Sequence, residues 1–318
     1  MKRILSVFLT LVLFLLIFAG CSDDYPDGDA NPASDFEYTV TDDGDVEITK
    51  YIGSDTDVVI PKKIENKKVA IIGEKAFHQS EIQTLAMPDS VKYIRASVFS
   101  YSANLKEIRI SSNLISVGAY AFSNCTSLVS VDLSASTMET LDSGAFKNCA
   151  GLKEVKFGKN ITEIRDESFY GCAALGEVVL PNSLTSLGDK AFGGCISLKS
   201  ITVPPKLDLM SINSPRLYDV PSLETITFAE GREEISGYAF VQTSASVEII
   251  VPKSVKKFSP LPFLINSDTP IKVTFLGDAP EISEENYWFG DPTICYDPSA
   301  DGWENFEWKD KYKLEEIK

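Results

Sequence analysis

The feature that most constrains this chain is a short motif that returns along most of its length. The segments GAYAFSNCTSLVSVDL, DSGAFKNCAGLKEVKF and RDESFYGCAALGEVVL, which end at Leu133, Phe157 and Leu180, are variants of one pattern. Each variant contains one large apolar landmark residue, and successive landmarks lie 22 to 25 residues apart: Phe77, Phe99, Phe122, Phe146, Phe169, Phe192, Leu217, Phe240 and Phe263. A period of this length is typical of solenoid proteins, in which each repeat forms one turn of a coil.

Each unit also carries the alternation of a short β-strand. Apolar residues follow the landmark at six, nine and eleven positions, and in the unit of Phe169 these are Leu175, Val178 and Leu180. Apolar residues two positions apart point to one face of a strand, and one coil can bury that face only against its neighbours. We therefore predict a β-rich leucine-rich-repeat solenoid of about nine coils of 22–25 residues, with short strands stacked in parallel.

Two further positions of the unit indicate how the coil turns. Gly118 and Gly188 lie four residues before a landmark, where glycine permits a tight bend. Pro181 follows a predicted strand, and proline turns the chain away from a sheet because it cannot donate a ladder hydrogen bond. Leu184 and Leu187 are then expected to point back into the core.

Four cysteines share one position, three residues after the landmark: Cys125, Cys149, Cys172 and Cys195. Ser, Val or Thr occupies this position in other units, so we expect a column of small buried side chains. A redox or metal ladder is the alternative, but no histidine or second cysteine in each unit completes such a site. Cys295 lies apart from the column, and we expect it to be buried near the C-terminal end.

The first 20 residues have the organisation of a targeting segment. A basic start precedes an apolar run over residues 7–18, and Ala19 and Gly20 separate that run from Cys21. This order is typical of a secretory signal, and it resembles the bacterial lipoprotein signal, in which the cysteine becomes the lipidated first residue of the mature chain. Phe18 stands where that signal usually carries Leu, Val or Ile. A transmembrane helix is the alternative, although the apolar run is short for a membrane span.

Residues 21–35 are rich in Asp, Pro and Ser, so we predict a disordered acidic tether that carries the lipid on Cys21. Ser22, Asp23 and Asp24 follow the cysteine directly and resemble the surface-export signal of Bacteroidetes lipoproteins. The resemblance implies a lipoprotein of the bacterial outer membrane that is exposed on the cell surface. A plain acidic linker, with the protein on the periplasmic side, is the alternative.

The ends of a repeat array need caps that cover its core. Residues 36–71 alternate around Asp43-Gly44, which is a hairpin signal, and are predicted as an N-terminal β cap. Residues 72–282 are predicted as the repeats, and residues 283–318, which hold all three tryptophans, as an aromatic-rich C-terminal cap. The unit around Leu217 and residues 259–282 depart from the repeat pattern, so we expect a kink or a loosened stack there.

The repeat resembles one known family. The unit FxxCxxLxxIxI, the N-terminal segment that begins at Phe36 and the closing segment DPSADGWENF, which ends at Phe306, are similar to those of the BspA-like leucine-rich repeat surface proteins. The resemblance implies the solenoid fold and, for some members, binding or adhesion to proteins of a host or a neighbouring cell. It is specific for the fold and much less specific for a task.

Charge and histidine content exclude several classes of function. The formal net charge is −16, whereas nucleic-acid binding depends on Lys and Arg, so we predict no nucleic-acid partner. His78 is the one histidine of the chain, and no nucleophile–base pair or phosphate-binding loop is present in the sequence. We therefore expect a protein that is not an enzyme and that carries no cofactor or metal ion.

The outward positions of the predicted strands form the candidate binding face, because solenoids bind partners through extended concave surfaces. These positions lie eight and ten residues after the landmarks and carry no aromatic residue; the candidates are Glu107, Arg109, Asp132, Glu154, Lys156, Glu177, Thr202 and Thr227. A solvated sheet without a binding role is the plain alternative. A protein partner suits this polar, extended face better than a sugar ring does.

A glycan-binding accessory lipoprotein and a periplasmic envelope scaffold are the alternative functions. A glycan site needs aromatic platforms, and aromatic residues gather in residues 286–308. Packing of the C-terminal cap is the competing explanation for that cluster, because a tryptophan ring is normally buried and its N–H finds a partner.

Overall fold

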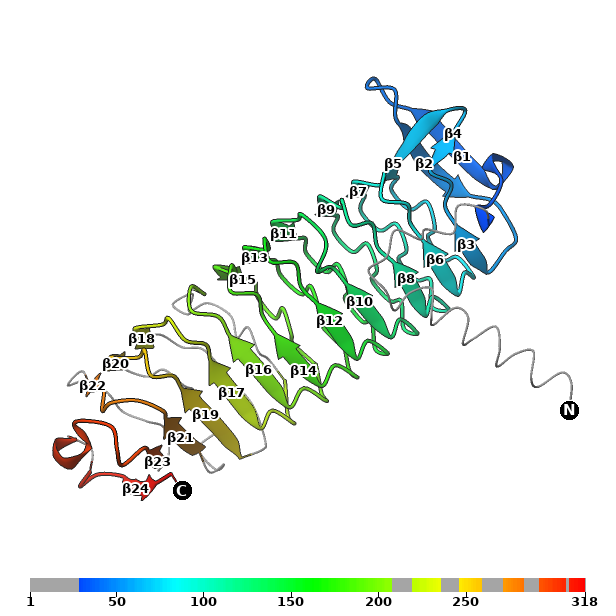
Figure 1. The fold of residues 1–318 in the computed structure, drawn as a ribbon. Coiled ribbons are helices and arrows are strands. Elements are labelled where there is room, and N and C mark those ends of the chain that lie inside the picture. The colour runs from blue at the N-terminus through cyan, green and yellow to red at the C-terminus, as the bar shows by residue number, and fades with distance from the viewer. Residues whose placement is uncertain are drawn as a thin grey trace, which may run out of the picture.

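The computed structural model describes residues 29–207, 219–235, 246–258, 271–282, 292–306 and 309–317. In these residues the chain forms an elongated parallel-strand β-solenoid of about 10 turns, which confirms the predicted fold (Figure 1). Longer strands lie along one side of the rod and shorter strands along the other side (Figure 1). The sequence predicted only the longer strand of each unit, because a strand of two residues leaves no alternating pattern to detect.

The longer strands form a surface that we call the long-strand face, and neighbouring members of each ladder run parallel. They are β3 (Asp57–Val59), β6 (Thr84–Ala86), β8 (Glu107–Arg109), β10 (Ser130–Asp132), β12 (Glu154–Lys156), β14 (Glu177–Val179), β16 (Ser200–Val203), β17 (Thr225–Phe228), β19 (Val247–Val251), β21 (Ile271–Phe275), β23 (Thr293–Tyr296) and β24 (Lys313–Glu316).

The opposite side, which we call the short-strand face, consists mainly of strands of two residues. They are β7 (Tyr93–Ile94), β9 (Ser116–Val117), β11 (Thr140–Leu141), β13 (Glu163–Ile164), β15 (Ser186–Leu187), β18 (Glu234–Ile235), β20 (Lys257–Phe258) and β22 (Glu281–Ile282). The ladder from β7 to β15 begins on strands of the N-terminal cap: β1 (Phe36–Val40), β2 (Val46–Tyr51) and β5 (Lys67–Ile72), with β4 (Lys63–Ile64) paired to β5.

Stacked columns of like residues fill the space between the two faces. The landmark rings from Phe77 to Phe192 are buried and lie parallel or nearly so, with 5.0 to 5.4 Å between neighbouring centroids. Leu184 and Leu187 are also buried, as predicted. Each column buries its apolar surface only against the next coil, so the coils stabilise one another. The landmarks Leu217, Phe240 and Phe263 lie outside the described residues.

The cysteine column is buried as predicted, and each thiol also has a hydrogen-bonding role. The Sγ atoms donate to the carbonyl oxygen of the landmark phenylalanine of the preceding coil, at 3.1, 3.0, 3.3 and 3.3 Å for Cys125, Cys149, Cys172 and Cys195. Ser102 makes the equivalent bond to Phe77 at 2.6 Å. Burial raises the pKa of Cys125 and Cys195 to about 12, so these thiols stay protonated and unreactive.

The glycines before the landmarks have a different role from the one the sequence suggested. Gly118 and Gly188 do not adopt a positive φ. A Cβ at Gly118 would meet the backbone of Ala96, and one at Gly188 would meet the backbone of Asp166 in the preceding coil. Glycine is therefore required there for close approach of two coils, and not for a bend that only glycine can make.

The N-terminal cap is an antiparallel hairpin of β1 and β2, turned at Gly44 with φ +82°, which confirms the hairpin signal. The segment expected as a tether is described from Asp29 onward, and Ala33–Asp35 form one turn of 3₁₀-helix. Asn31 is buried; its Nδ2 donates to Asp35 and Asp55, and its Oδ1 accepts from the Val59 N–H. These last residues of the tether are therefore bound to the cap instead of being free of it.

Trp303, in a second 3₁₀-helix (Trp303–Asn305), packs inside the C-terminal end. Its ring lies 4.9 Å from the ring of Tyr296 and 4.8 Å from that of Phe306, and its Nε1 donates to the Gly277 carbonyl at 3.1 Å. Cap packing is thus the correct interpretation for this tryptophan, and Cys295 is buried as expected. Trp288 and Trp308 lie outside the described residues.

The kink that the sequence suggested in the last third is not found in the described strands. β14, β16, β17, β19, β21, β23 and β24 form one continuous parallel ladder through that part of the rod. Strand register is kept by Ile201, Ile226 and Ile249, which lie opposite one another in β16, β17 and β19 and are buried. No helix among the described residues is long and apolar enough to cross a membrane.

Candidate functional site

All eight candidate residues of the predicted binding face lie on the long-strand face. Glu107 and Arg109 belong to β8, Asp132 to β10, Glu154 and Lys156 to β12, Glu177 to β14, Thr202 to β16 and Thr227 to β17. Parallel pairing places Asp132 opposite Lys156, and Thr202 opposite Thr227. The repeat period therefore brings these side chains into two columns along the rod, at the positions that the sequence predicted.

Arg109 is turned toward the edge of the face. Its Nη1 donates to the Met87 carbonyl at 2.6 Å, and its Nη2 lies 3.4 Å from the Asp89 carboxylate. Partial burial alone would raise the pKa of Asp89, but the Ser112 N–H and the Arg109 charge outweigh it and leave that pKa lowered. Arg109 is thus held by its own chain and half-buried, and it is less available to a partner than the other charged candidates.

Charges at the centre of the face are exposed and only loosely paired. Lys156 Nζ lies 3.7 Å from both Asp132 Oδ2 and Glu154 Oε1. More than half of each of these side chains is exposed, so the pairs contribute little to stability and can be exchanged for a partner's charges. Glu177 is likewise exposed on β14.

Ladder pairing along the long-strand face is interrupted at two places among the described strands, between β8 and β10 and between β12 and β14. We call the second place the opening between β12 and β14. On β12, Val155 and Phe157 are only half-buried, whereas Val178 of β14 is 2% exposed. Phe157 stands where the neighbouring coils carry leucine, and its ring meets Phe169 edge-on at 5.7 Å. Phe228 occupies the same repeat position in β17 and is buried in a paired strand, so a phenylalanine there does not by itself interrupt the ladder.

A groove of about 1080 Å³ lies over this opening. Its apolar part includes Val155, Phe157 and Val179, and Val179 is 69% exposed. Charged side chains surround that part: Lys153, Glu154, Lys156, Lys159 and Glu177. Leu180, Pro181, Asn182 and Ser183 from the following turn close one end.

The groove brings together three of the predicted residues and two that the prediction missed. Glu154, Lys156 and Glu177 line it, whereas the other five candidates do not. Val179 occupies an outward position ten residues after Phe169, and Phe157 occupies the inward position eleven residues after Phe146. A valine in a column of charged and hydroxylated residues was the available signal for Val179. The opening itself left no signal, because the repeat pattern is the same in coils whose strands pair and in coils whose strands do not.

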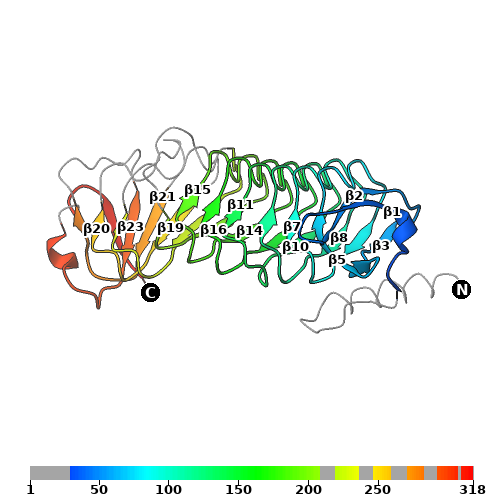
Figure 2. The same ribbon diagram turned by 90° about the horizontal axis from the view of Figure 1, so that it is seen from above.

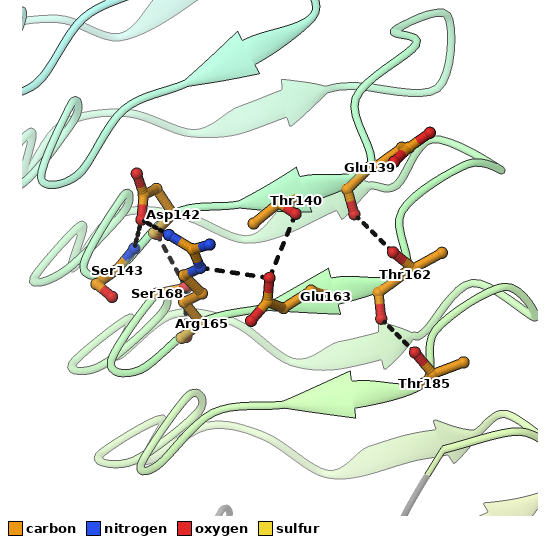
Figure 3. Close-up of polar contacts among 9 residues, drawn as sticks. All are labelled: Glu139, Thr140, Asp142, Ser143, Thr162, Glu163, Arg165, Ser168 and Thr185. Carbon is orange, nitrogen blue, oxygen red and sulfur yellow. Dashed lines mark hydrogen bonds and ion pairs between the residues drawn. The ribbon is translucent and has the colours of Figure 1, made fainter.

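The short-strand face is organised differently. Arg165 Nη1 donates to Asp142 Oδ1 at 2.9 Å, and its Nε lies 3.3 Å from Glu163 Oε2, which also accepts from the Thr140 hydroxyl (Figure 3). The Thr162 hydroxyl donates to a backbone carbonyl of the preceding coil, and the Thr185 hydroxyl repeats this bond one coil later (Figure 3). Polar groups of this face thus find partners within the chain.

Metal-ligand residues and the one histidine of the chain are placed as follows. No group of three or more His, Cys, Asp or Glu side chains within the described ranges is placed to hold a metal ion. His78 Nδ1 lies 2.6 Å from the Ser100 hydroxyl, which donates to the Ser97 carbonyl. The predicted lipid anchor Cys21 and the export signal Ser22, Asp23 and Asp24 lie outside the described residues.

The fold and this face define a leucine-rich-repeat scaffold of the kind that mediates protein interactions. The family model described as BspA type Leucine rich repeat region matches residues 56–176 and 162–284, with 6 copies. The chain therefore belongs to the BspA type leucine-rich repeat family. No curated protein matches the chain.

Solved structures with similar folds are bacterial leucine-rich repeat proteins. The T. pallidum Leucine Rich Repeat protein is 24% identical, covers 66% of this chain and 86% of its own, and has a TM-score of 0.48. A leucine rich cell surface protein from Faecalibacterium prausnitzii is 20% identical, with coverage of 93% and 96% and a TM-score of 0.47. A leucine-rich repeat protein from Bacteroides ovatus is 17% identical, with coverage of 91% and 100% and a TM-score of 0.34.

Proposed function

We propose that this protein is a non-enzymatic cell-surface lipoprotein that binds a protein of a host or of a neighbouring cell through its long-strand face. Cys21 carries the lipid that anchors it to the bacterial outer membrane, and Ser22, Asp23 and Asp24 direct it to the outer surface. Membership of the BspA type family and its repeat scaffold support a role in protein interaction.

The groove between β12 and β14 is the observation that carries the proposal. Stable protein interfaces have an apolar centre that excludes water and a polar rim that fixes orientation. Val179 and Phe157 supply an apolar centre, and Lys156, Glu154 and Glu177 supply a rim with charges of both signs. A sheet with one continuous ladder and an even polar surface would not offer this combination.

Localisation is tested by protease treatment of intact cells, followed by blotting for this protein and for a periplasmic control. Loss of this protein while the control survives is the expected result. If the protein is as protected as the control, the surface location is wrong, and the partner has to be sought inside the outer membrane.

Binding is tested with the variant Val179→Asp and the matched control Ile115→Asp. Both residues are exposed aliphatic side chains, but Ile115 lies beside the short-strand face, where its N–H donates to Lys92. We expect Val179→Asp to weaken binding of labelled protein to host cells by roughly tenfold or more, because a buried carboxylate without a partner is costly in an interface. Ile115→Asp should bind as the wild type does. Equal effects of the two variants would contradict the assignment of the face.

A further inference from the structure

The turns around the landmark phenylalanines hold two residues each in the left-handed backbone region. One lies two positions before the landmark and the other two positions after it, with φ between 51° and 73°: Lys75, Ser97, Tyr120, Gly144, Glu167 and Lys190, and Gln79, Tyr101, Asn124, Asn148, Gly171 and Gly194. Glycine and asparagine adopt this conformation most readily, and bulky residues do so rarely. Tyr101 and Tyr120 are therefore unusual occupants of these positions.

Burial does not explain these two tyrosines. Tyr101 is 56% exposed and Tyr120 is 42% exposed, so neither ring fills the core. Other coils carry residues as different as glycine, asparagine, serine, lysine and glutamate at the same positions and keep the same turn, so the turn itself does not require tyrosine. Strained residues that contribute little to packing are concentrated at binding sites, where the side chain serves a ligand.

Neighbouring residues hold the tyrosine rings in place along one edge of the rod. The ring of His78 meets the ring of Tyr101 edge-on at 5.8 Å between centroids. The ring of Tyr120 lies over Gly144 of the next coil, where any Cβ would overlap it. Two coils beyond Tyr120, the Tyr170 ring lies 5.3 Å from the Lys147 ammonium, which is bound to Glu167 at 2.6 Å. We call this row of His78, Tyr101, Tyr120, Lys147 and Tyr170 the turn ridge; the turns follow one another in Figure 2.

Polar side chains occupy the same turns as the rings. Asn148 Nδ2 donates to Asn124 Oδ1 at 3.2 Å, and Asn124 Nδ2 donates to the Ser123 hydroxyl at 2.8 Å. Each amide N–H₂ has a second hydrogen that these bonds do not use. Gln79 and Tyr101 are exposed and add an amide and a phenol. The turns thus combine aromatic rings with hydrogen-bonding groups.

We propose that the turn ridge binds an extended neutral polysaccharide that lies along the rod. The C–H groups on the face of a sugar ring are attracted to the negative face of an aromatic ring, and its hydroxyls need the amides and hydroxyls of the same turns. Coils repeat at about 4.8 Å, so the rings of His78, Tyr101 and Tyr120, which belong to three successive coils, can contact neighbouring units of a linear chain, and Tyr170 can contact a unit farther along. The net charge of −16 disfavours acidic polysaccharides. This site is separate from the groove on the long-strand face and does not depend on the proposed function.

The test is affinity electrophoresis of the full chain, kept in solution by a detergent without sugar groups, in gels that contain pullulan, hydroxyethyl cellulose or mannan. The double variant Tyr101→Asn/Tyr120→Gly replaces each tyrosine with a residue that other coils carry at the same position, so it should fold at least as well as the wild type. We expect retardation of the wild type by at least one of the three polysaccharides. The double variant should bind it roughly tenfold more weakly or worse. Val179→Asp should be retarded as the wild type is.

Three results would overturn the proposal. The first is a wild type that none of the three polysaccharides retards. The second is a double variant that is folded, as judged by its thermal unfolding, and is retarded equally. The third is a pair of observations on host cells: the double variant binds them less well than the wild type, and the wild type still binds after glycosidases have removed the cell-surface glycans. That pair would make the ridge a protein-contact site.

Discussion

The two faces of the solenoid are built from the same repeat, but in the middle of the rod their polar groups are paired differently. On the short-strand face, Arg165 and Glu163 are paired within the chain, and the ladder from β5 to β15 is unbroken (Figure 3). On the long-strand face, Lys156 is paired only loosely, and Val179 is left 69% exposed beside the opening between β12 and β14. Toward the C-terminal end the long-strand face again has a continuous ladder, from β14 to β24, and a closer pair of Lys272 and Glu248 at 2.8 Å. The difference teaches that the repeat can keep its core intact while one stretch of the long-strand face is left available for binding.

Both faces pack on one core, so removing part of that core should destabilise both faces and give the largest expected loss in the free energy of unfolding. Phe146 stacks on Phe122 and Phe169 at 5.0 and 5.4 Å and is fully buried. We expect Phe146→Ala to lower the free energy of unfolding by about 3–5 kcal/mol, because it removes buried apolar surface and leaves a cavity. Chemical denaturation measures this loss, and Phe146→Leu should lose clearly less. A loss below about 1 kcal/mol would contradict the role of the column.

The cysteine column should make stability depend on alkaline pH. The pKa of Cys125 and Cys195 rises from 9.0 to about 12 on folding, so their contribution is full below pH 9 and is lost as the pH rises toward 12. At pH 10 each thiol should lower the free energy of unfolding by about 1 kcal/mol relative to its value below pH 9, because one pKa unit corresponds to about 1.4 kcal/mol.

The matched measurement is the free energy of unfolding of the wild type and of Cys125→Ser/Cys195→Ser at pH 8 and pH 10. Serine keeps the hydrogen bond, as Ser102 does in its coil, and does not ionise in this range. The double variant should lose less stability between the two pH values than the wild type. Equal losses would show that the thiols do not titrate on unfolding as described.

Removing a charged side chain should lower the free energy of unfolding by a smaller amount, and by more on the short-strand face than on the long-strand face. Arg165 on the short-strand face has two carboxylate partners, at 2.9 and 3.3 Å, whereas Lys156 on the long-strand face has two at 3.7 Å. We expect Arg165→Ala to cost about 0.5–1 kcal/mol of stability at low salt and Lys156→Ala less than about 0.3 kcal/mol. High salt should reduce the first effect. The comparison fails if Lys156→Ala costs as much as Arg165→Ala.

Most of the fold could be predicted because it depends on a period, and the period is visible in one chain. The landmark column, the leucines and the cysteine column repeat at fixed spacing, so their burial follows from stacking alone. The two-residue strands were missed because their hydrogen bonds, and not their sequence, define them. The kink or loosened stack expected around Leu217 and in residues 259–282 falls largely outside the described residues, while the described strands there, such as β19 and β21, keep a register of buried apolar pairs.

The candidate site was predicted only in part. The positions of Glu154, Lys156 and Glu177 follow from strand alternation, but their meeting at a groove depends on the pairing lost between β12 and β14. The tyrosines of the turn ridge were overlooked because the sequence does not show which side chains of a turn are exposed. Aromatic residues in the turns beside the landmarks were the signal that could have found them.

The central claim is that a protein partner contacts the long-strand face at the opening between β12 and β14. The most direct measurement places a photo-crosslinking amino acid at Val179, and in a second variant at Ile115, in the protein displayed on intact cells exposed to host cells. The account predicts a discrete protein adduct from position 179 and none from position 115. Adducts of equal yield from both positions, or an adduct from position 115 alone, would contradict it.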